Sequence, residues 1–279
     1  MDYERERILQ KMCAQARIRT MQTIHEANSG HIGGSLSVIE ILIALYFEIL
    51  RINPQDPLWE KRDRVVVSKG HCSPAVYNVL AMRGYFSQDA LNKGFRKLGS
   101  IFSGHVELHV PGVDMSTGSL GQGLSVACGM ALSAQISGCD WHTYAILGDG
   151  ELQEGQVWEA FMAAGNLRLS NLTAIIDNNG VQLDGTCEQI MDFEPLGEKL
   201  LAFGWDIIHL DGHCIKSLVD TLAKVKYAKR PVAVIAHTVK GKGVSFMEGN
   251  HKWHGAQPDA QQYEQAMREL YATAAELEG

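Results

Sequence analysis

Short apolar runs alternate with stretches of helical periodicity between residues 140 and 240. The apolar runs are continuous, as expected of strands that are covered on both faces. Their alternation with helices predicts an α/β fold, a parallel β-sheet with helices on both faces. The predicted strands are 143–148, 172–177, 205–210 and 232–238, and the predicted helices lie near 153–168, 194–203 and 214–229.

The first part of the chain predicts a helical layer and one further strand. Residues 4–26 have helical spacing, and "SVIE" at 37–40 has the pattern of a capping box, Ser37 with Glu40, that opens an apolar helix reaching about Leu50. "RVVVS" at 64–68 is predicted as a buried strand, and "GHCSPAVYNVLAMRG" then restarts a helix. A last helix begins near Asp259. No linker-like segment interrupts this pattern, so residues 1–279 are predicted to form a single domain with an N-terminal helical layer.

Charge and composition narrow the classes of partner. With 25 basic and 32 acidic residues the net charge is −7, and without a basic run we expect neither nucleic acid nor a membrane surface as partner. The start "MDYERERILQ" lacks the apolar core of a signal peptide. Six scattered cysteines form no C-x-x-C pair, which is typical of reduced thiols. These features predict a cytoplasmic protein.

The stretch "LGDGE" at 147–151 places a carboxylate where a predicted strand ends. Ligands of doubly wound sheets bind beyond the carboxyl ends of the strands. The next strand ends in "IIDNNG", so Asp177, Asn178 and Asn179 should emerge beside Asp149. A carboxylate, an amide oxygen and a backbone carbonyl form a hard oxygen site of the kind Mg²⁺ uses with phosphate ligands. An aspartate that merely caps the turn after the strand would have the same local sequence.

Four histidines lie in loops rich in small residues, "SGHIGG", "SKGHCS", "FSGHVE" and "KWHGA". If the sheet gathers these loops at one edge, they form a cluster suited to sugar hydroxyls, phosphate and proton transfer. Otherwise they are unrelated surface residues. The remaining candidates lack such a context: His213 is interpreted as structural or surface, and Lys240 and Lys242 as exposed loop lysines, although they could neutralise phosphate.

The segment "GDGELQEG…WEAF…AGNLRLSNLTAIIDNNG" resembles the thiamine-diphosphate-binding motif, GDG followed about thirty residues later by NN. Further segments resemble blocks of the transketolase family in the family's order, over roughly residues 20 to 260. They are "NSGHIGGSLSVIEILIALYF", "RDRVVVSKGHCSPAVYNVLAMRGY", "GHVELHVPGVDMSTGSLGQGLSVACGMAL" and "NHKWHGAQPD". What they resemble is the amino-terminal, diphosphate-binding part of a full-length transketolase.

The resemblance implies a role for each matching position. Mg²⁺, or Ca²⁺ or Mn²⁺ in its place, would be held by Asp149, Asn179 and the carbonyl of Val181. Thiamine diphosphate would contact Gly118, Leu120, Gly150 and Leu183, with Glu154 and Glu159 at the dimer-forming cofactor interface. The histidines around the diphosphate, thiazolium and sugar would be His31, His71, His105 and His254, of which His71 and His254 would also bind the cofactor.

The resemblance also implies a second chain. In this family another domain holds the cofactor's aminopyrimidine, and no stretch after "NHKWHGAQPD" could supply it. We therefore expect the N-terminal subunit of a split transketolase, a transferase that moves a two-carbon ketol unit from a ketose phosphate to an aldose or aldose phosphate. It would act only with a C-terminal subunit that carries the pyrimidine-binding domain, as an α2β2 heterotetramer. The interface acids and the apolar helix at 38–50 suggest that the chain also self-associates.

Three other functions remain open at this stage. The α subunit of a thiamine-dependent 2-oxo acid dehydrogenase carries the same GDG…NN motif, but "GSLGQGLSVACGMAL" favours transketolase. The same blocks and the short chain disfavour a deoxyxylulose phosphate synthase. A non-catalytic descendant should have lost some of the site residues, all of which are present.

Overall fold

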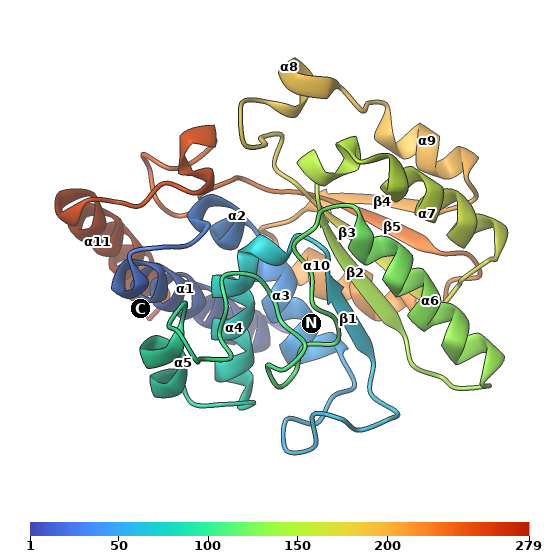
Figure 1. Cartoon of the computed structure of the whole chain (residues 1–279), viewed down its shortest axis with the longest axis horizontal. Coiled ribbons are helices and arrows are strands. Elements are labelled where there is room, and N and C mark those ends of the chain that lie inside the picture. The colour runs from blue at the N-terminus through green and yellow to red at the C-terminus, as the bar shows by residue number, and fades with distance from the viewer. Residues whose placement is uncertain (279) are drawn as a thin grey trace.

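A computed structural model describes residues 1–278, and within them five parallel strands form one sheet (Figure 1). The strand order is β1-β2-β3-β5-β4, and all neighbouring pairs are parallel. The fold class predicted from the sequence is confirmed. The strands are β1 (Arg64–Val67), β2 (Thr143–Gly148), β3 (Leu172–Asn178), β4 (Asp206–Asp211) and β5 (Val232–His237).

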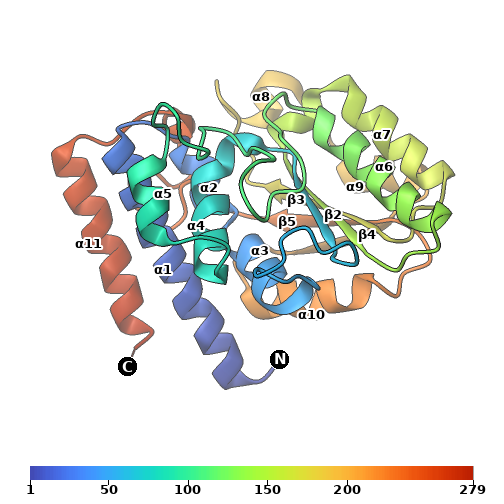
Figure 2. The same ribbon diagram turned by 60° about the horizontal axis from the view of Figure 1, so that its bottom comes forward.

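Helices cover both faces of the sheet because alternate strand residues point to opposite sides (Figures 1 and 2). In β1, Val65 and Val67 join the core on one face and Val66 joins the core on the other. One face packs against α6 (Gln122–Ile136), α7 (Gly155–Asn166) and α9 (Leu196–Ala202). The other packs against α1 (Tyr3–Ala27), α3 (Ile39–Ala44), α4 (Ser73–Arg83) and α10 (Ile215–Val225).

A third apolar cluster lies beside the sheet, where α1 packs against α11 (Ala260–Glu276) and α2 (Ile32–Ser37). Figure 2 shows α1 and α11 side by side at one end of the molecule. This is the predicted N-terminal helical layer, joined by the last helix, whose N-cap is Asp259. The shorter elements are α5 (Gln88–Gly94), α8 (Cys187–Met191), the π-helix η1 (Leu45–Ile49) and the 3₁₀ helices η2 (Gly70–Cys72), η3 (Gly150–Gln153) and η4 (His251–His254).

The predicted capping box at Ser37 is wrong. The helical segment begins earlier, at Ile32, and Ser37 is the last residue of α2. Its hydroxyl donates to the buried carboxylate of Asp177, at 2.6 Å, instead of accepting from a backbone amide. The local sequence matched a helix cap, but the Ser37 side chain forms its hydrogen bond with Asp177, which is distant in the sequence. Helix α6 was also not predicted as a helix.

Most of the apolar segment predicted as a helix at 38–50 is core, not surface. Every residue from Val38 to Tyr46 is buried within the chain, against α1, α4 and α10. Its apolar character is explained by the core of this chain. Among residues 1–278, none of the helices combines the length and the apolar character that crossing a bilayer requires.

Candidate active site

The carboxyl ends of β2 and β3 bring the GDG and NN segments together, as predicted from the strand order. Gly148 pairs in register with Asp177, so Asp149 follows directly beside the end of β3. The Asp149 carboxylate accepts hydrogen bonds from the amides of Gly150, at 2.8 Å, and Gly180. The amide oxygen of Asn179 accepts from the Val181 amide at 3.2 Å. The turn after β3 thus folds over Asp149.

The buried carboxylate of Asp149 would be stabilised by a bound cation. Its side chain is only 2% exposed. Burial, reinforced by the nearby charge of Asp177, raises its pKa to about 6. A divalent ion would remove this penalty, and the oxygens around it are of the hard type that such ions prefer. The donor set therefore fits the metal that the resemblance implies. Nowhere in residues 1–278 do three or more His, Cys, Asp or Glu side chains form a metal-binding group, so the candidate site rests on this mixed set of oxygens.

Two buried lysines make the same pocket attractive to an anion. Lys240 is 3% exposed, so its interpretation as a surface lysine is wrong. Its ammonium donates to the Val181 carbonyl and to Nδ1 of His254, both at 3.1 Å. Burial and the charge of Lys69 lower its pKa to about 8. The other buried lysine, Lys69, is already paired with the Asp177 carboxylate. A bound diphosphate would therefore compensate the charge of Lys240.

The four loop histidines lie together, as predicted for loops gathered at one sheet edge. The ring centroid of His31 is 5.3 Å from that of His71, 5.6 Å from that of His105 and 5.4 Å from that of His254. Burial lowers the pKa of all four rings, with help from Arg96 for His31, to about 4, and from Lys240 for His254, to about 3. At neutral pH the cluster is uncharged, so each ring offers one hydrogen-bond donor and one acceptor.

A cavity of about 280 Å³ joins these groups. Leu183, 56% exposed, stands at its rim. Gly118 lies next to the histidines: its φ of +153° suits glycine, and a Cβ there would come within 2.8 Å of His105. Only Glu159 lies apart from the cavity and the histidines, on the exposed side of α7. The candidate residues that line the cavity are His71, Leu120, Asp149, Gly150, Glu154, Asn179, Val181, Leu183 and His254.

Sequence reasoning missed the buried ions that support the site. We expected Asp177 to emerge beside Asp149, but it turns inward and is fully buried. There it pairs with Lys69 and accepts from Ser37 and Thr238. Burial alone would raise its pKa, but Lys69 and the hydroxyl groups outweigh burial and hold the pKa below its usual value. The only sequence signals were a lysine shortly after the apolar run of β1 and an aspartate at the end of the apolar run of β3.

Glu151 is a second missed residue, 2% exposed and placed under the GDG turn. One carboxylate oxygen accepts from the Ser68 hydroxyl and the Gly121 amide, and the other from the Gly148 amide at 3.1 Å. It therefore ties the ends of β1 and β2 to the start of α6. Together with Asp177, it fixes the backbone that presents the candidate ligands.

Comparison with known proteins decides the family. The family model described as "Transketolase, thiamine diphosphate binding domain" matches residues 8–276. The chain belongs to the transketolase family. The resemblance noted in the sequence is thereby confirmed, and the thiamine-diphosphate-binding fold with it.

Relatives of similar length carry names of transketolase subunits. One of them, a subunit of apulose-4-phosphate transketolase from Phocaeicola vulgatus, is 44% identical over 263 residues, which cover 94% of this chain and 93% of that protein. The 6-deoxy-6-sulfo-D-fructose transketolase subunit SqwG of Clostridium sp. is 43% identical over 253 residues, 90% of this chain and 92% of that protein.

Full-length transketolases are matched over less than half their length. Human transketolase is 36% identical over 272 residues, 97% of this chain but 43% of that protein. The crystal structure of Campylobacter jejuni transketolase superposes with a TM-score of 0.90 at 31% identity, covering 99% of this chain and 46% of that one. The chain is thus equivalent to one part of the transketolases whose structures are known.

Proposed function

We propose that the chain is the diphosphate-binding, N-terminal subunit of a split transketolase. The observation that carries this proposal is the pocket at the ends of β2 and β3, which combines Asp149, two buried lysines and four uncharged histidines. Relatives named as transketolase subunits, matched over more than 90% of their length, support the two-chain arrangement. The reaction would be reversible transfer of a two-carbon ketol unit from a ketose phosphate to an aldose or aldose phosphate.

The pocket residues would divide the binding of Mg²⁺ and thiamine diphosphate between them. Asp149, Asn179 and the Val181 carbonyl would hold the metal ion, or Ca²⁺ or Mn²⁺ in its place. Lys240 would neutralise diphosphate oxygens, and Leu120 and Leu183 would pack against the apolar parts of the cofactor. When bound, thiamine diphosphate supplies the carbanion that allows the bond between C2 and C3 of the ketose to break.

The histidine cluster would orient the sugar and handle its protons. Because the pKa values of His31, His71, His105 and His254 are lowered, these rings are neutral at physiological pH and can accept hydrogen bonds from substrate hydroxyls. Their positions on two loops and on the 3₁₀ helices η2 and η4 let them contact one small ligand from several sides. His71 and His254 line the cofactor cavity itself, and His31 and His105 lie behind them.

The partner would be a separate C-terminal subunit that carries the pyrimidine-binding domain. Leu183 at the cavity rim, together with Glu154 and Glu159, occupies an exposed position, and all three would face that subunit. We propose an α2β2 assembly in the cytoplasm, with residues 1–279 as a single diphosphate-binding domain.

Reconstitution tests this function. Thiamine diphosphate with Mg²⁺ is titrated calorimetrically into the chain alone, into the candidate partner alone and into their mixture, and ketol transfer is then measured with ketose phosphates. We expect weak binding to the chain, tight binding to the mixture and activity only in the mixture. No ketol transfer by a mixture that binds the cofactor, with turnover of a 2-oxo acid instead, would assign the chain to the dehydrogenases. No binding in any sample would support a non-catalytic descendant.

A further inference from the structure

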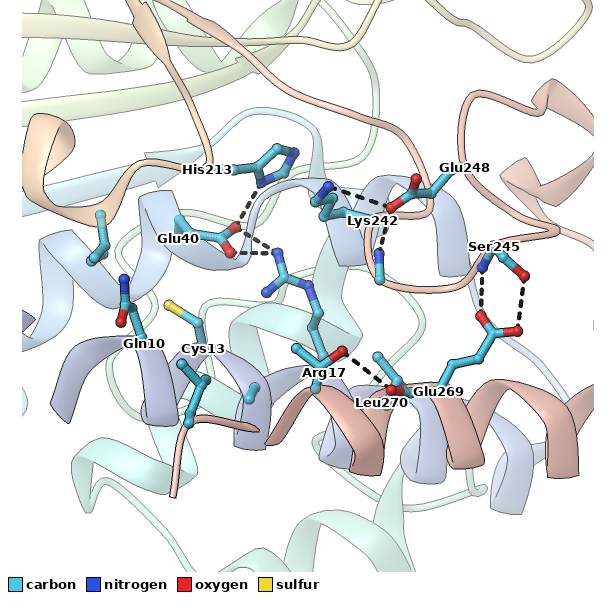
Figure 3. A pocket seen from close by; sticks show the side chains of 15 residues that line it. Gln10, Cys13, Arg17, Glu40, His213, Lys242, Ser245, Glu248, Glu269 and Leu270 are labelled. Carbon is cyan, nitrogen blue, oxygen red and sulfur yellow. Dashed lines mark hydrogen bonds and ion pairs between the residues drawn. The ribbon is translucent and has the colours of Figure 1, made fainter. Parts of the chain in front are cut away.

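A buried polar cluster lies behind the candidate site, between α1, α3 and α10 (Figure 3). Glu40 is its centre. Nη2 of Arg17 donates to Glu40 at 2.6 Å, and Nδ1 of His213 lies 3.0 Å from the same carboxylate. Burial would raise the pKa of Glu40, but Arg17 and His213 outweigh burial and hold it below its usual value. Figure 3 shows the three side chains converging beside a cavity of about 540 Å³.

The hydrogen bonds determine which ring nitrogen of His213 carries the proton. Its Nε2 is 2.8 Å from the amide nitrogen of Val239, and an amide can only donate. Nε2 is therefore unprotonated, and the proton of the neutral ring is on Nδ1, where it is donated to Glu40. The ring thus links a buried carboxylate on α3 to the backbone that follows β5.

Val239 is the residue before Lys240, which reaches into the cofactor cavity. At Val239 the chain has left β5, which ends at His237, so no neighbouring strand pairs with its amide. The flanking residues are held by backbone contacts: the Thr238 amide donates to Asn178 at 3.1 Å and the Gly241 amide to Gly33 at 3.0 Å. Within residues 1–278 the amide of Val239 is held by the imidazole of His213.

The loop after β4 is built for this contact. Gly212 lets the two backbones approach closely, because a Cβ at this position would lie 2.4 Å from the Thr238 side chain. The Gly212 amide donates to the His237 carbonyl at 2.8 Å, and the His213 amide donates to the Asp211 carboxylate at 2.9 Å. Both bonds direct the imidazole of His213 toward Val239.

We propose that His213, oriented by Glu40, is a positioning residue that holds the Val239–Lys240 backbone so that the Lys240 ammonium stays in the cofactor cavity. The proposal rests on the proposed function, because it assigns Lys240 to the binding of a diphosphate. It extends the site to residues that touch neither cofactor nor substrate. His213, first interpreted as structural or surface, would then determine cofactor affinity from outside the cavity.

Two substitutions separate this role from a purely structural one. His213→Asn keeps a donor near the place of Nδ1, facing Glu40, but is too short to reach Val239. His213→Gln places an amide oxygen near the place of Nε2, where it can accept from Val239, and loses the donor to Glu40. A positioning role requires the Asn variant to be the damaged one, whereas support of the buried carboxylate alone would make the Gln variant the damaged one.

The first measurement is the Kd of thiamine diphosphate with Mg²⁺ for the reconstituted complex of each variant. We expect the Kd of H213N to rise about tenfold, which equals about 1.4 kcal/mol, with kcat near the wild-type value at saturating cofactor. We expect H213Q to stay within about twofold. Wild-type affinity in H213N, or a tenfold loss in H213Q, would overturn the inference, and the H213Q result decides even if H213N does not fold. No binding by the wild-type complex would instead refute the proposed function.

Hydrogen exchange of the Val239 amide tests the contact without the cofactor. In the wild type and in H213Q this amide should exchange slowly, and in H213N it should exchange at least tenfold faster while the amides of β5 remain protected. Equal protection of Val239 in all three proteins would show that His213 does not hold this backbone, and would overturn the inference.

Discussion

Replacing Asp149 by asparagine should stabilise the chain in the absence of cofactor while abolishing retention of cofactor and metal. The buried carboxylate is penalised by desolvation and by Asp177, which raises its pKa from 3.8 to about 6. Since one pKa unit corresponds to about 1.4 kcal/mol, the ionised side chain costs the folded chain about 3 kcal/mol at pH 7. Asparagine lacks the charge, but its NH2 group cannot accept from the backbone amide, Gly150 or Gly180, that it would face. The lost hydrogen bond offsets about 1–2 kcal/mol of the gain, so we expect a net stabilisation of about 1–2 kcal/mol at pH 7.

The pH dependence of this gain follows from the direction of the shift. A carboxyl group whose pKa is higher in the folded than in the unfolded chain destabilises the folded chain fully above about pH 6, and the effect disappears as the pH falls below about 4. The advantage of Asp149→Asn in unfolding free energy should therefore be about 1.5 kcal/mol smaller at pH 5 than at pH 7.

Asp177→Asn is the matched control, because it makes the same chemical change one strand away in the opposite electrostatic setting. Asp177 neutralises the buried ammonium of Lys69, and its removal leaves that charge without a partner. Loss of one member of a buried ion pair costs about 3–5 kcal/mol. The two variants should thus shift the unfolding free energy in opposite directions.

The assay is urea-induced unfolding of the cofactor-free chain at pH 7 and pH 5, followed by circular dichroism, together with calorimetric titration of thiamine diphosphate and Mg²⁺ into the reconstituted complex. The reasoning would be refuted if Asp149→Asn were less stable than the wild type at pH 7, or if its advantage grew at pH 5. Retention of cofactor by Asp149→Asn at wild-type affinity would show that the metal assignment is wrong.

Three further predictions follow from named contacts. Burial lowers the pKa of His254 to about 3, so at pH 5 this ring binds a proton in the unfolded chain but not in the folded chain. The folded chain should therefore lose about 2 kcal/mol of unfolding free energy at this ring between pH 7 and pH 5. Urea unfolding of His254→Gln at both pH values should show a smaller loss than the wild type, and equal losses would contradict the assignment. In calorimetric titration of the reconstituted complex, Lys240→Met should raise the Kd of thiamine diphosphate at least tenfold without lowering the unfolding free energy. The control Lys242→Met should not change this Kd, because the Lys242 side chain is partly exposed and pairs with Glu248. Gly165→Ala should destabilise the chain by about 3 kcal/mol, because its Cβ would lie 1.8 Å from a backbone carbonyl oxygen, while Gly129→Ala on α6, with nothing within 4 Å, should gain about 0.5–1 kcal/mol in thermal or urea unfolding.

Much of the site was visible in the sequence because its ligands lie at strand ends. The strands were recognised from continuous apolar runs, and the predicted 143–148 coincides with β2. Parallel neighbours end at one edge, so Asp149 and Asn179, thirty positions apart, had to converge. The clustering of the four histidines depended on the same topology.

Local patterns failed where a distant partner competed for a side chain. Ser37 had the sequence of a helix cap, but its hydroxyl donates a hydrogen bond to Asp177, 140 positions away. Lys240 lay in a glycine-rich loop typical of exposed residues, yet it is buried against Val181 and His254. No periodicity records such contacts, because each depends on which segments the completed sheet brings side by side.

The sequence by itself determined the parallel α/β sheet and the edge at which Asp149 and Asn179 meet, since these follow from apolar periodicity and from residues adjacent to strand ends. The tertiary structure alone decided which ions are buried and with what partner. Lys69 and Asp177 are 108 positions apart, and so are stabilised only when β1 and β3 are both in place. Burial in a low-dielectric interior then sets the pKa values, and with them the charge that the pocket presents.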